Sequence, residues 1–227
     1  LPLVVAMVGL VASATHLGNP ANALYVFIGV GRSPLSTEVF FAVVFLALAG
    51  LYWLYNFVEH PKRQLQRVWL ALAMLAGVVF VVAVGFAYAA DTIVSWYTAY
   101  VPLNLVLNAL AGGPVLAIAG LRIAGYEPVE GRMGRVLAVV ALALAANVVT
   151  FGLQSADLGT IENSYLTAAQ LVPSYGLMIG AFGVLGMAGI GLDVAALWGR
   201  ARLSVARTVG AAVLMLGGIF IMRFAFY

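Results

Sequence analysis

Apolar residues fill seven long stretches of this chain, and short polar segments separate them. A stretch of about 20 apolar residues is long enough to cross the hydrocarbon core of a bilayer as a helix. Because lipid offers no hydrogen-bond partners, each span must satisfy its backbone groups internally. We therefore predict an all-α integral membrane helical bundle, a single transmembrane domain over residues 1–227. The predicted spans lie near residues 1–16, 37–57, 67–89, 101–121, 135–154, 175–198 and 205–226.

The first stretch, residues 1–16, is too short to cross completely, and the sequence starts at Leu1 rather than at a methionine. It also lacks the basic start and the small-residue cleavage site of a secretory signal peptide. We expect a further span before Leu1, which gives seven spans in this chain and eight in the full-length protein.

The composition supports a membrane protein and excludes a soluble globular one, since 64% of the residues are hydrophobic and only 8% are charged. The protein has no cysteine. It therefore cannot ligate an iron–sulfur cluster through thiolates, and any such cluster belongs to a partner. The formal net charge of +3 indicates no nucleic-acid partner. The surroundings implied by this composition are membrane lipids.

The cations fall into alternate connections between the predicted spans. Short loops rich in Lys and Arg stay on the cytoplasmic side of a membrane. Three such loops contain, in order, Lys62, Arg63 and Arg67; Arg122, Arg132 and Arg135; and Arg200, Arg202 and Arg207. We therefore predict a multi-pass protein of the cytoplasmic (inner) membrane with its C-terminus outside. His16 and Glu38 then face outward, with Arg32 and Arg223 as the outer cations.

The predicted outer connections are longer and chemically more varied than the basic ones. They cover residues 17–36, 90–102 and 154–175. Trp96 and Tyr97 are typical of any membrane interface. The remaining polar surface is expected to form a docking platform for soluble partners.

The span at residues 175–198 has two unusual features. It contains closely spaced glycines, which allow backbones to approach and predict a central position for this span. These are Gly176, Gly180, Gly183, Gly186, Gly189 and Gly191. It also contains Asp193, just inside the predicted inner boundary, which we expect to reach water.

Two ionisable residues stand out at the predicted outer ends of the first two spans. His16 is one of only two histidines, and an imidazole there can exchange protons near neutral pH. Glu38, on the next span, is its expected partner. The residues alone leave other interpretations open. His16 can cap the first span, and Glu38 can be a carboxylate favoured by the helix dipole, with Ser36 as the N-cap.

Several segments together resemble the membrane anchor subunits of the dimethyl sulfoxide reductase family. The resemblance runs from the family's second span to its eighth, and the order and spacing of the segments carry it. The matching segments are residues 15–20 (THLGNP), 33–38 (SPLSTE), 91–102, 112–114 (GGP), 157–161 (DLGTI), 171–176 (LVPSYG) and 223–227.

The resemblance implies the quinol-oxidising, metal-free anchor of a molybdenum enzyme. It implies two soluble partners on the outer face, a four-cluster iron–sulfur subunit and a molybdopterin catalytic subunit. Electrons then pass from menaquinol to the iron–sulfur subunit, and protons are released outside. The family's quinol-site histidine and glutamate match His16 and Glu38. The protein is thus expected to be a non-catalytic subunit of an oxidoreductase complex that carries the quinol oxidation site.

Arg32 and Arg223 are weaker candidates for the same quinol site. Arg32 has three open interpretations: it binds lipid phosphate, pairs with Glu38 or orients a quinone carbonyl. Arg223, close to the outer end of the last span, is either a snorkelling anchor or part of the outer charged cluster.

The residues argue against several other membrane functions. A haem held by two histidines is excluded, because His16 and His60 lie on opposite sides of a core about 30 Å thick. A retinal protein needs a lysine within a span, and Lys62, the only lysine, is in a loop. A transporter is a weaker alternative, since Asn104, Asn108 and Asn147 are uncharged and can simply join helices. The more serious alternative is a purely structural membrane tether.

Overall fold

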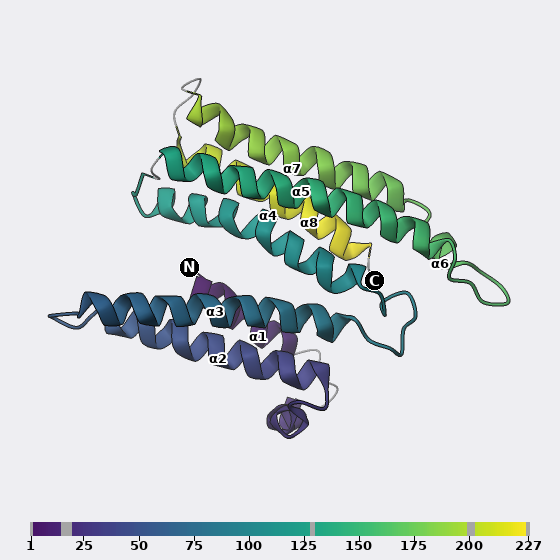
Figure 1. Cartoon of the computed structure of the whole chain (residues 1–227), viewed down its shortest axis with the longest axis horizontal. Coiled ribbons are helices and arrows are strands. Elements are labelled where there is room, and N and C mark those ends of the chain that lie inside the picture. The colour runs from purple at the N-terminus through teal and green to yellow at the C-terminus, as the bar shows by residue number, and fades with distance from the viewer. Residues whose placement is uncertain (1, 15–19, 128–129, 199–202, 226–227) are drawn as a thin grey trace. The chain divides into compact units, whose positions relative to one another are not determined.

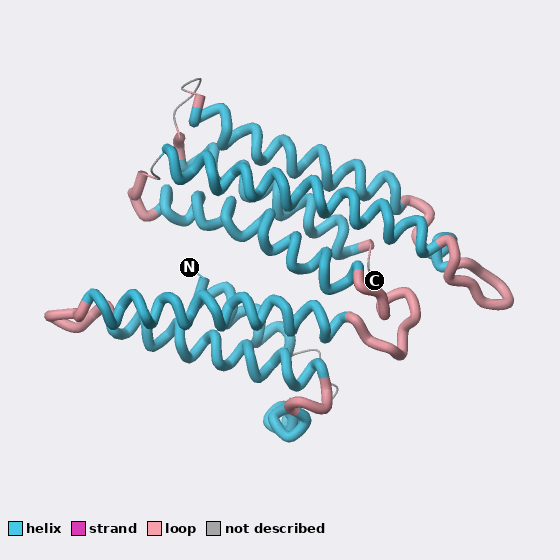
Figure 2. Tube along the Cα trace, viewed as in Figure 1, coloured by secondary structure: helices cyan, strands magenta, loops and turns pink. Residues whose placement is uncertain are grey.

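The fold is built from helices, as predicted (Figures 1 and 2). The computed structural model describes residues 2–14, 20–127, 130–198 and 203–225. Within these ranges the β-structure is limited to one isolated bridge between Glu162 and Thr167. The prediction of an all-α membrane bundle is confirmed.

Six helices of the described residues are long and apolar enough to span a membrane. They are α2 (Pro34–Tyr55), α3 (Arg63–Tyr88), α4 (Tyr100–Ile123), α5 (Glu130–Leu158), α7 (Tyr175–Leu197) and α8 (Val205–Phe224). The shorter elements are α1 (Pro2–Ala14), the 3₁₀ helix η1 (Pro20–Gly29) and α6 (Ala168–Leu171). The seven predicted spans therefore correspond to six long helices and to α1, which has 13 residues and is shorter than a full crossing.

The protein divides into two compact units, Leu1–Ala90 and Asp91–Tyr227, called here the first unit and the second unit. In the first unit α2 packs along α3, and α1 and η1 pack on α2 (Figure 1). Phe45 and Phe80 stack between α2 and α3 with ring centroids 6.2 Å apart. The Trp69 indole nitrogen donates a hydrogen bond of 2.9 Å to the Leu48 carbonyl oxygen. These contacts fix the register of the helix pair.

The start of α2 differs from its prediction. Ser33 is the N-cap, its side-chain oxygen accepts from the Ser36 backbone N–H at 3.5 Å, and Pro34 occupies the first helical turn. Proline suits this place because its missing N–H has no helical partner there. The prediction of Ser36 as the cap is therefore wrong: Ser36 lies inside the helix and is buried.

The second unit is a ring of four helices, in which α4 packs on α5, α5 on α7, α7 on α8 and α8 on α4. In Figure 1 these helices, in chain order, run in alternating directions along the bundle. Val115, Val140, Phe182 and Met215, one from each helix, have no exposed surface. The core of this unit therefore lies on the axis of the ring.

Glycines bring the helices of the second unit close together. A Cβ atom on Gly189 would lie 2.8 Å from the Ala211 carbonyl oxygen, and one on Gly218 would lie 3.2 Å from that of Phe182. The α7 and α8 backbones therefore meet at distances that larger residues would prevent. The prediction of close packing by the 175–198 span is confirmed. Its central position is wrong, because α7 is one member of the ring.

One end of the second unit is basic and contains a buried carboxylate. Arg122 lies at the end of α4, Arg132 and Arg135 at the start of α5, and Arg207 at the start of α8. Asp193 is completely buried, and its oxygens have no hydrogen-bond partner among the described residues. The expectation that Asp193 reaches water is therefore wrong. Arg207, at the start of α8, acts on it electrostatically.

Candidate functional site

Glu38, one of the two main predicted site residues, lies in the second turn of α2. Its side chain is half-buried, and it forms no hydrogen bond or ion pair with another described residue. A carboxylate near a helix N-terminus is favoured by the helix dipole. Glu38 is therefore held at one end of the first unit with its oxygens available to a ligand.

The turn before α2 is tied to the helix by Thr37. The Thr37 hydroxyl donates to the Ser33 carbonyl oxygen at 2.9 Å and accepts from the Gly31 N–H at 3.1 Å. Gly31 has a φ of 79°, a conformation that residues with a side chain rarely adopt. This turn positions Arg32 just outside the helix.

A groove of about 350 Å³ lies beside this turn, between the start of α2 and the end of α3. Its lining combines apolar and aromatic side chains with one cation. The lining includes Arg32, Thr37, Phe41, Val82 and Phe86. Glu38 directly follows Thr37 in the sequence but does not line the groove.

The structure groups only part of the predicted site. Arg32 and Glu38 lie at the same end of α2 but do not form an ion pair, which excludes one interpretation of Arg32. His16 lies outside the described residues. Arg223 belongs to the second unit, so its grouping with Arg32 and Glu38 stays a prediction.

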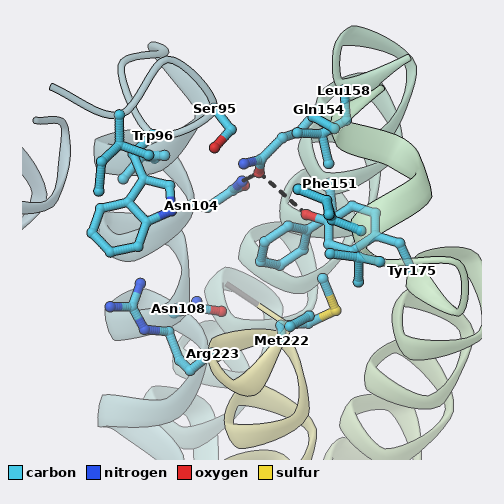
Figure 3. A pocket seen from close by; sticks show the side chains of 16 residues that line it. Ser95, Trp96, Asn104, Asn108, Phe151, Gln154, Leu158, Tyr175, Met222 and Arg223 are labelled. Carbon is cyan, nitrogen blue, oxygen red and sulfur yellow. Dashed lines mark hydrogen bonds between the residues drawn. The ribbon is translucent and has the colours of Figure 1, made fainter. Parts of the chain in front are cut away.

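The second unit contains a cavity of about 240 Å³ at the end of the ring opposite Arg122, Arg132, Arg135 and Arg207 (Figure 3). The connection before α4, the start of α4 and the segment around α6 contribute to it, as do the adjoining ends of α5, α7 and α8. Trp96, Phe151 and Tyr175 supply aromatic walls. The Phe151 and Phe182 rings meet edge to face with centroids 5.6 Å apart, which fixes the Phe151 ring against the core.

Buried amides line the same cavity and bond to one another. The Asn104 side-chain N–H donates to the Gln154 side-chain oxygen at 2.8 Å, and the Tyr175 hydroxyl donates to the same oxygen at 3.4 Å (Figure 3). Asn104 is 4% exposed and Gln154 is 6% exposed. Three helices are thus joined by hydrogen bonds at the cavity wall.

The polar network continues from the cavity into the bundle. The Thr150 hydroxyl donates to the Asn104 side-chain oxygen, and the Asn147 side-chain N–H donates to the Asn108 oxygen at 2.6 Å. Asn147 has no exposed surface. The interpretation of these asparagines as links between helices is therefore confirmed. Asn104 and Asn108 also face the cavity, which was not predicted from the sequence.

A signal for this cavity exists in the sequence. Asn104 and Asn108 are four residues apart on α4, and Asn147, Thr150 and Gln154 follow intervals of three and four on α5. These intervals place polar side chains on one face of each helix. Two polar stripes on neighbouring spans predict a shared polar interior.

Arg223 lies in the last turn of α8 and lines this cavity beneath Trp96 in Figure 3. Its side chain is half-buried and already takes part in an interaction within the protein. No group of three or more His, Cys, Asp or Glu residues in the described part of the protein can hold a metal ion.

Comparison with known proteins gives one consistent family. A model of the DMSO reductase anchor subunit (DmsC) family matches residues 1–227. The YnfH subunit of an anaerobic dimethyl sulfoxide reductase from Escherichia coli (strain K12) is 34% identical over 220 residues, which cover 97% of this protein and 76% of that relative. No solved structure matches.

Two further relatives are each named as the C subunit of an anaerobic dimethyl sulfoxide reductase. The Escherichia coli (strain K12) protein is 36% identical over 174 residues, which cover 76% of this protein and 60% of that relative. The Haemophilus influenzae protein is 29% identical over 171 residues, which cover 75% of this protein and 61% of that relative. The match therefore spans about three-fifths of the length of these two relatives.

Proposed function

Since this protein belongs to the DMSO reductase anchor subunit family, we propose that it holds a molybdopterin oxidoreductase at the membrane and oxidises menaquinol for it. The electrons pass to a four-cluster iron–sulfur partner subunit and then to the catalytic subunit. The anchor itself does not act on the terminal substrate, and it contributes the quinol oxidation site.

Glu38 and His16 form the proposed quinol site. The observation that carries this assignment is the half-buried Glu38 carboxylate, which has no partner among the described residues and directly follows Thr37, a lining residue of the groove with aromatic walls. A quinol combines an aromatic ring with two hydroxyl groups, so it needs both an apolar wall and hydrogen-bond acceptors. His16, in the family's matching motif, supplies the second acceptor.

The chemistry requires two proton acceptors for each quinol. Oxidation of one menaquinol to menaquinone releases two electrons and two protons. His16 accepts one proton and Glu38 the other, and both pass them to water. The electrons leave to the partner's nearest cluster. Arg32, at the groove, donates a hydrogen bond to a ring oxygen once the quinone carbonyls form.

The charge distribution supports the proposed orientation in the cytoplasmic membrane. Cations gather in the connections after α2, α4 and α7, and these connections stay cytoplasmic under the positive-inside rule. The quinol site and the C-terminus then lie outside. The soluble subunits dock on this outer face, so that electrons travel a short path from quinol to cluster.

The test compares the two histidines of the protein in the assembled complex. We expect His16→Ala to abolish quinol oxidation while both soluble subunits still bind the membrane. The matched control is His60→Ala, which changes an exposed residue between α2 and α3 and should leave activity unchanged. If quinol oxidation survives His16→Ala, the protein is a structural tether.

A further inference from the structure

We infer that the cavity of the second unit is a second quinone-binding site, separate from the proposed oxidation site. It binds the oxidised headgroup and carries out no redox chemistry on it. The cavity of about 240 Å³ exceeds the roughly 150 Å³ of a protein cavity that binds benzene. It therefore has room for an aromatic headgroup. The choice of a quinone among aromatic carbonyl compounds rests on the proposed function.

The walls of the cavity match the flat, apolar faces of such a ring. Trp96 and Phe151 lie on either side of the space in Figure 3, Met222 lies below Phe151, and Tyr175 also lines the cavity. Aromatic and thioether side chains pack favourably on an aromatic ligand. A hydrated ion gains nothing from these walls, so they select against a small inorganic ligand.

The polar groups of the cavity are suited to carbonyl oxygens. The Gln154 oxygen accepts from Asn104 and Tyr175, and the Asn108 oxygen accepts from Asn147. The amide nitrogens of Gln154 and Asn108 donate to no other described residue, and both residues line the cavity. Two N–H donors fixed by their own oxygen bonds can meet the two carbonyl oxygens of a quinone.

The cavity lacks what oxidation of a quinol would need. No His, Asp, Glu or Lys is among the described residues that line it. A quinol bound there has no side chain to accept its two protons near neutral pH. The site therefore stores or exchanges quinone, whereas the first unit carries out the chemistry.

A phospholipid headgroup is the competing ligand, and the lining disfavours it. A phosphate needs several cations or charged donors to offset its desolvation. The cavity has one cation among its described lining residues, Arg223, and that residue is already engaged within the protein. Neutral amides and aromatic walls fit a neutral headgroup better.

The test uses the tryptophan in the cavity wall as a reporter. The 227-residue protein is placed in phosphatidylcholine nanodiscs and titrated with 1,4-naphthoquinone while tryptophan fluorescence is recorded. We expect saturable quenching, and Trp96→Phe should remove that component. Ala168→Phe fills the cavity without removing a side-chain hydrogen bond and should weaken binding at least tenfold. Its matched control, Ala117→Phe, changes an exposed position of α4 and should bind normally.

Three outcomes would overturn the inference: quenching that never saturates, equal binding by Ala168→Phe and Ala117→Phe, or displacement by phosphatidylglycerol that depends on Arg223. Glu59→Gln, an exposed change in the first unit, serves as a further control and should leave this binding unchanged. Quinol oxidation is assayed separately in the complex. If naphthoquinone does not bind in the cavity but quinol oxidation depends on His16, only this inference is contradicted. If naphthoquinone binds in the cavity but quinol oxidation does not depend on His16, only the proposed function is contradicted.

Discussion

The two units of the protein bury different shares of their helices. In the most apolar stretches of α2 and α3, 11% and 17% of the residues are buried, whereas the four helices of the second unit reach 22% to 39%. Lipid is as apolar as a leucine side chain, so exposed apolar surface costs little in a membrane. The second unit therefore builds its own packed interior, whereas α2 and α3 of the first unit bury a smaller share of their residues.

The polar residues of the two units differ in the same way. The first unit places Glu38, which can titrate, near an open groove. The second unit places neutral amides in its interior. These amides cannot titrate, and their hydrogen bonds join neighbouring helices. The proposed function therefore places proton chemistry in the first unit, whereas the hydrogen-bonded amides that join helices lie in the second unit. The following predictions test this division.

The largest expected effect concerns catalysis in the first unit. Glu38→Gln keeps the shape of the side chain but removes the proton acceptor, and we expect quinol oxidation to fall by about 100-fold or more. The rate is measured with the assembled complex and a menaquinol analogue. Glu59→Gln, an exposed change in the connection after α2, is the control. A rate within a factor of two of the parent protein would remove Glu38 from the mechanism.

The next effect concerns packing in the second unit. Gly189→Ala forces a methyl group against the Ala211 backbone, and we expect a loss of about 1–3 kcal/mol in the free energy of unfolding. Gly180→Ala on the same helix and Gly50→Ala in the first unit meet open space and should not destabilise. Unfolding in mixed detergent micelles measures the difference. Equal stabilities for the three variants would contradict the tight α7–α8 contact.

The smallest expected effect concerns the amide network. Exchanging Asn104 and Gln154 for leucine, singly and together, measures the coupling between them. We expect about 0.6 kcal/mol, the average for hydrogen bonds between membrane helices, and at most about 1.7 kcal/mol. A coupling near zero would mean that this hydrogen bond adds nothing to the rigidity of the second unit.

Hydropathy alone predicted the helices well, because the length of an apolar stretch is set by the bilayer. It missed the start of α2 by three residues, since Ser33 and Pro34 determine that start through capping rather than through hydrophobicity. It also missed the burial of Asp193 and the cavity. Both depend on how neighbouring helices are rotated about their axes, which a count of apolar residues does not encode. The polar stripes of α4 and α5 were the available signal.

The amide network also bears on how the protein enters the membrane during synthesis. A helix inserted alone would expose its amides to lipid, where each unpaired polar group is costly. Asn104 and Asn108 on α4 find partners in Gln154 and Asn147 on α5, the next long helix to leave the ribosome. We therefore expect α4 and α5 to enter the bilayer together as a hairpin, with their polar stripes already facing each other.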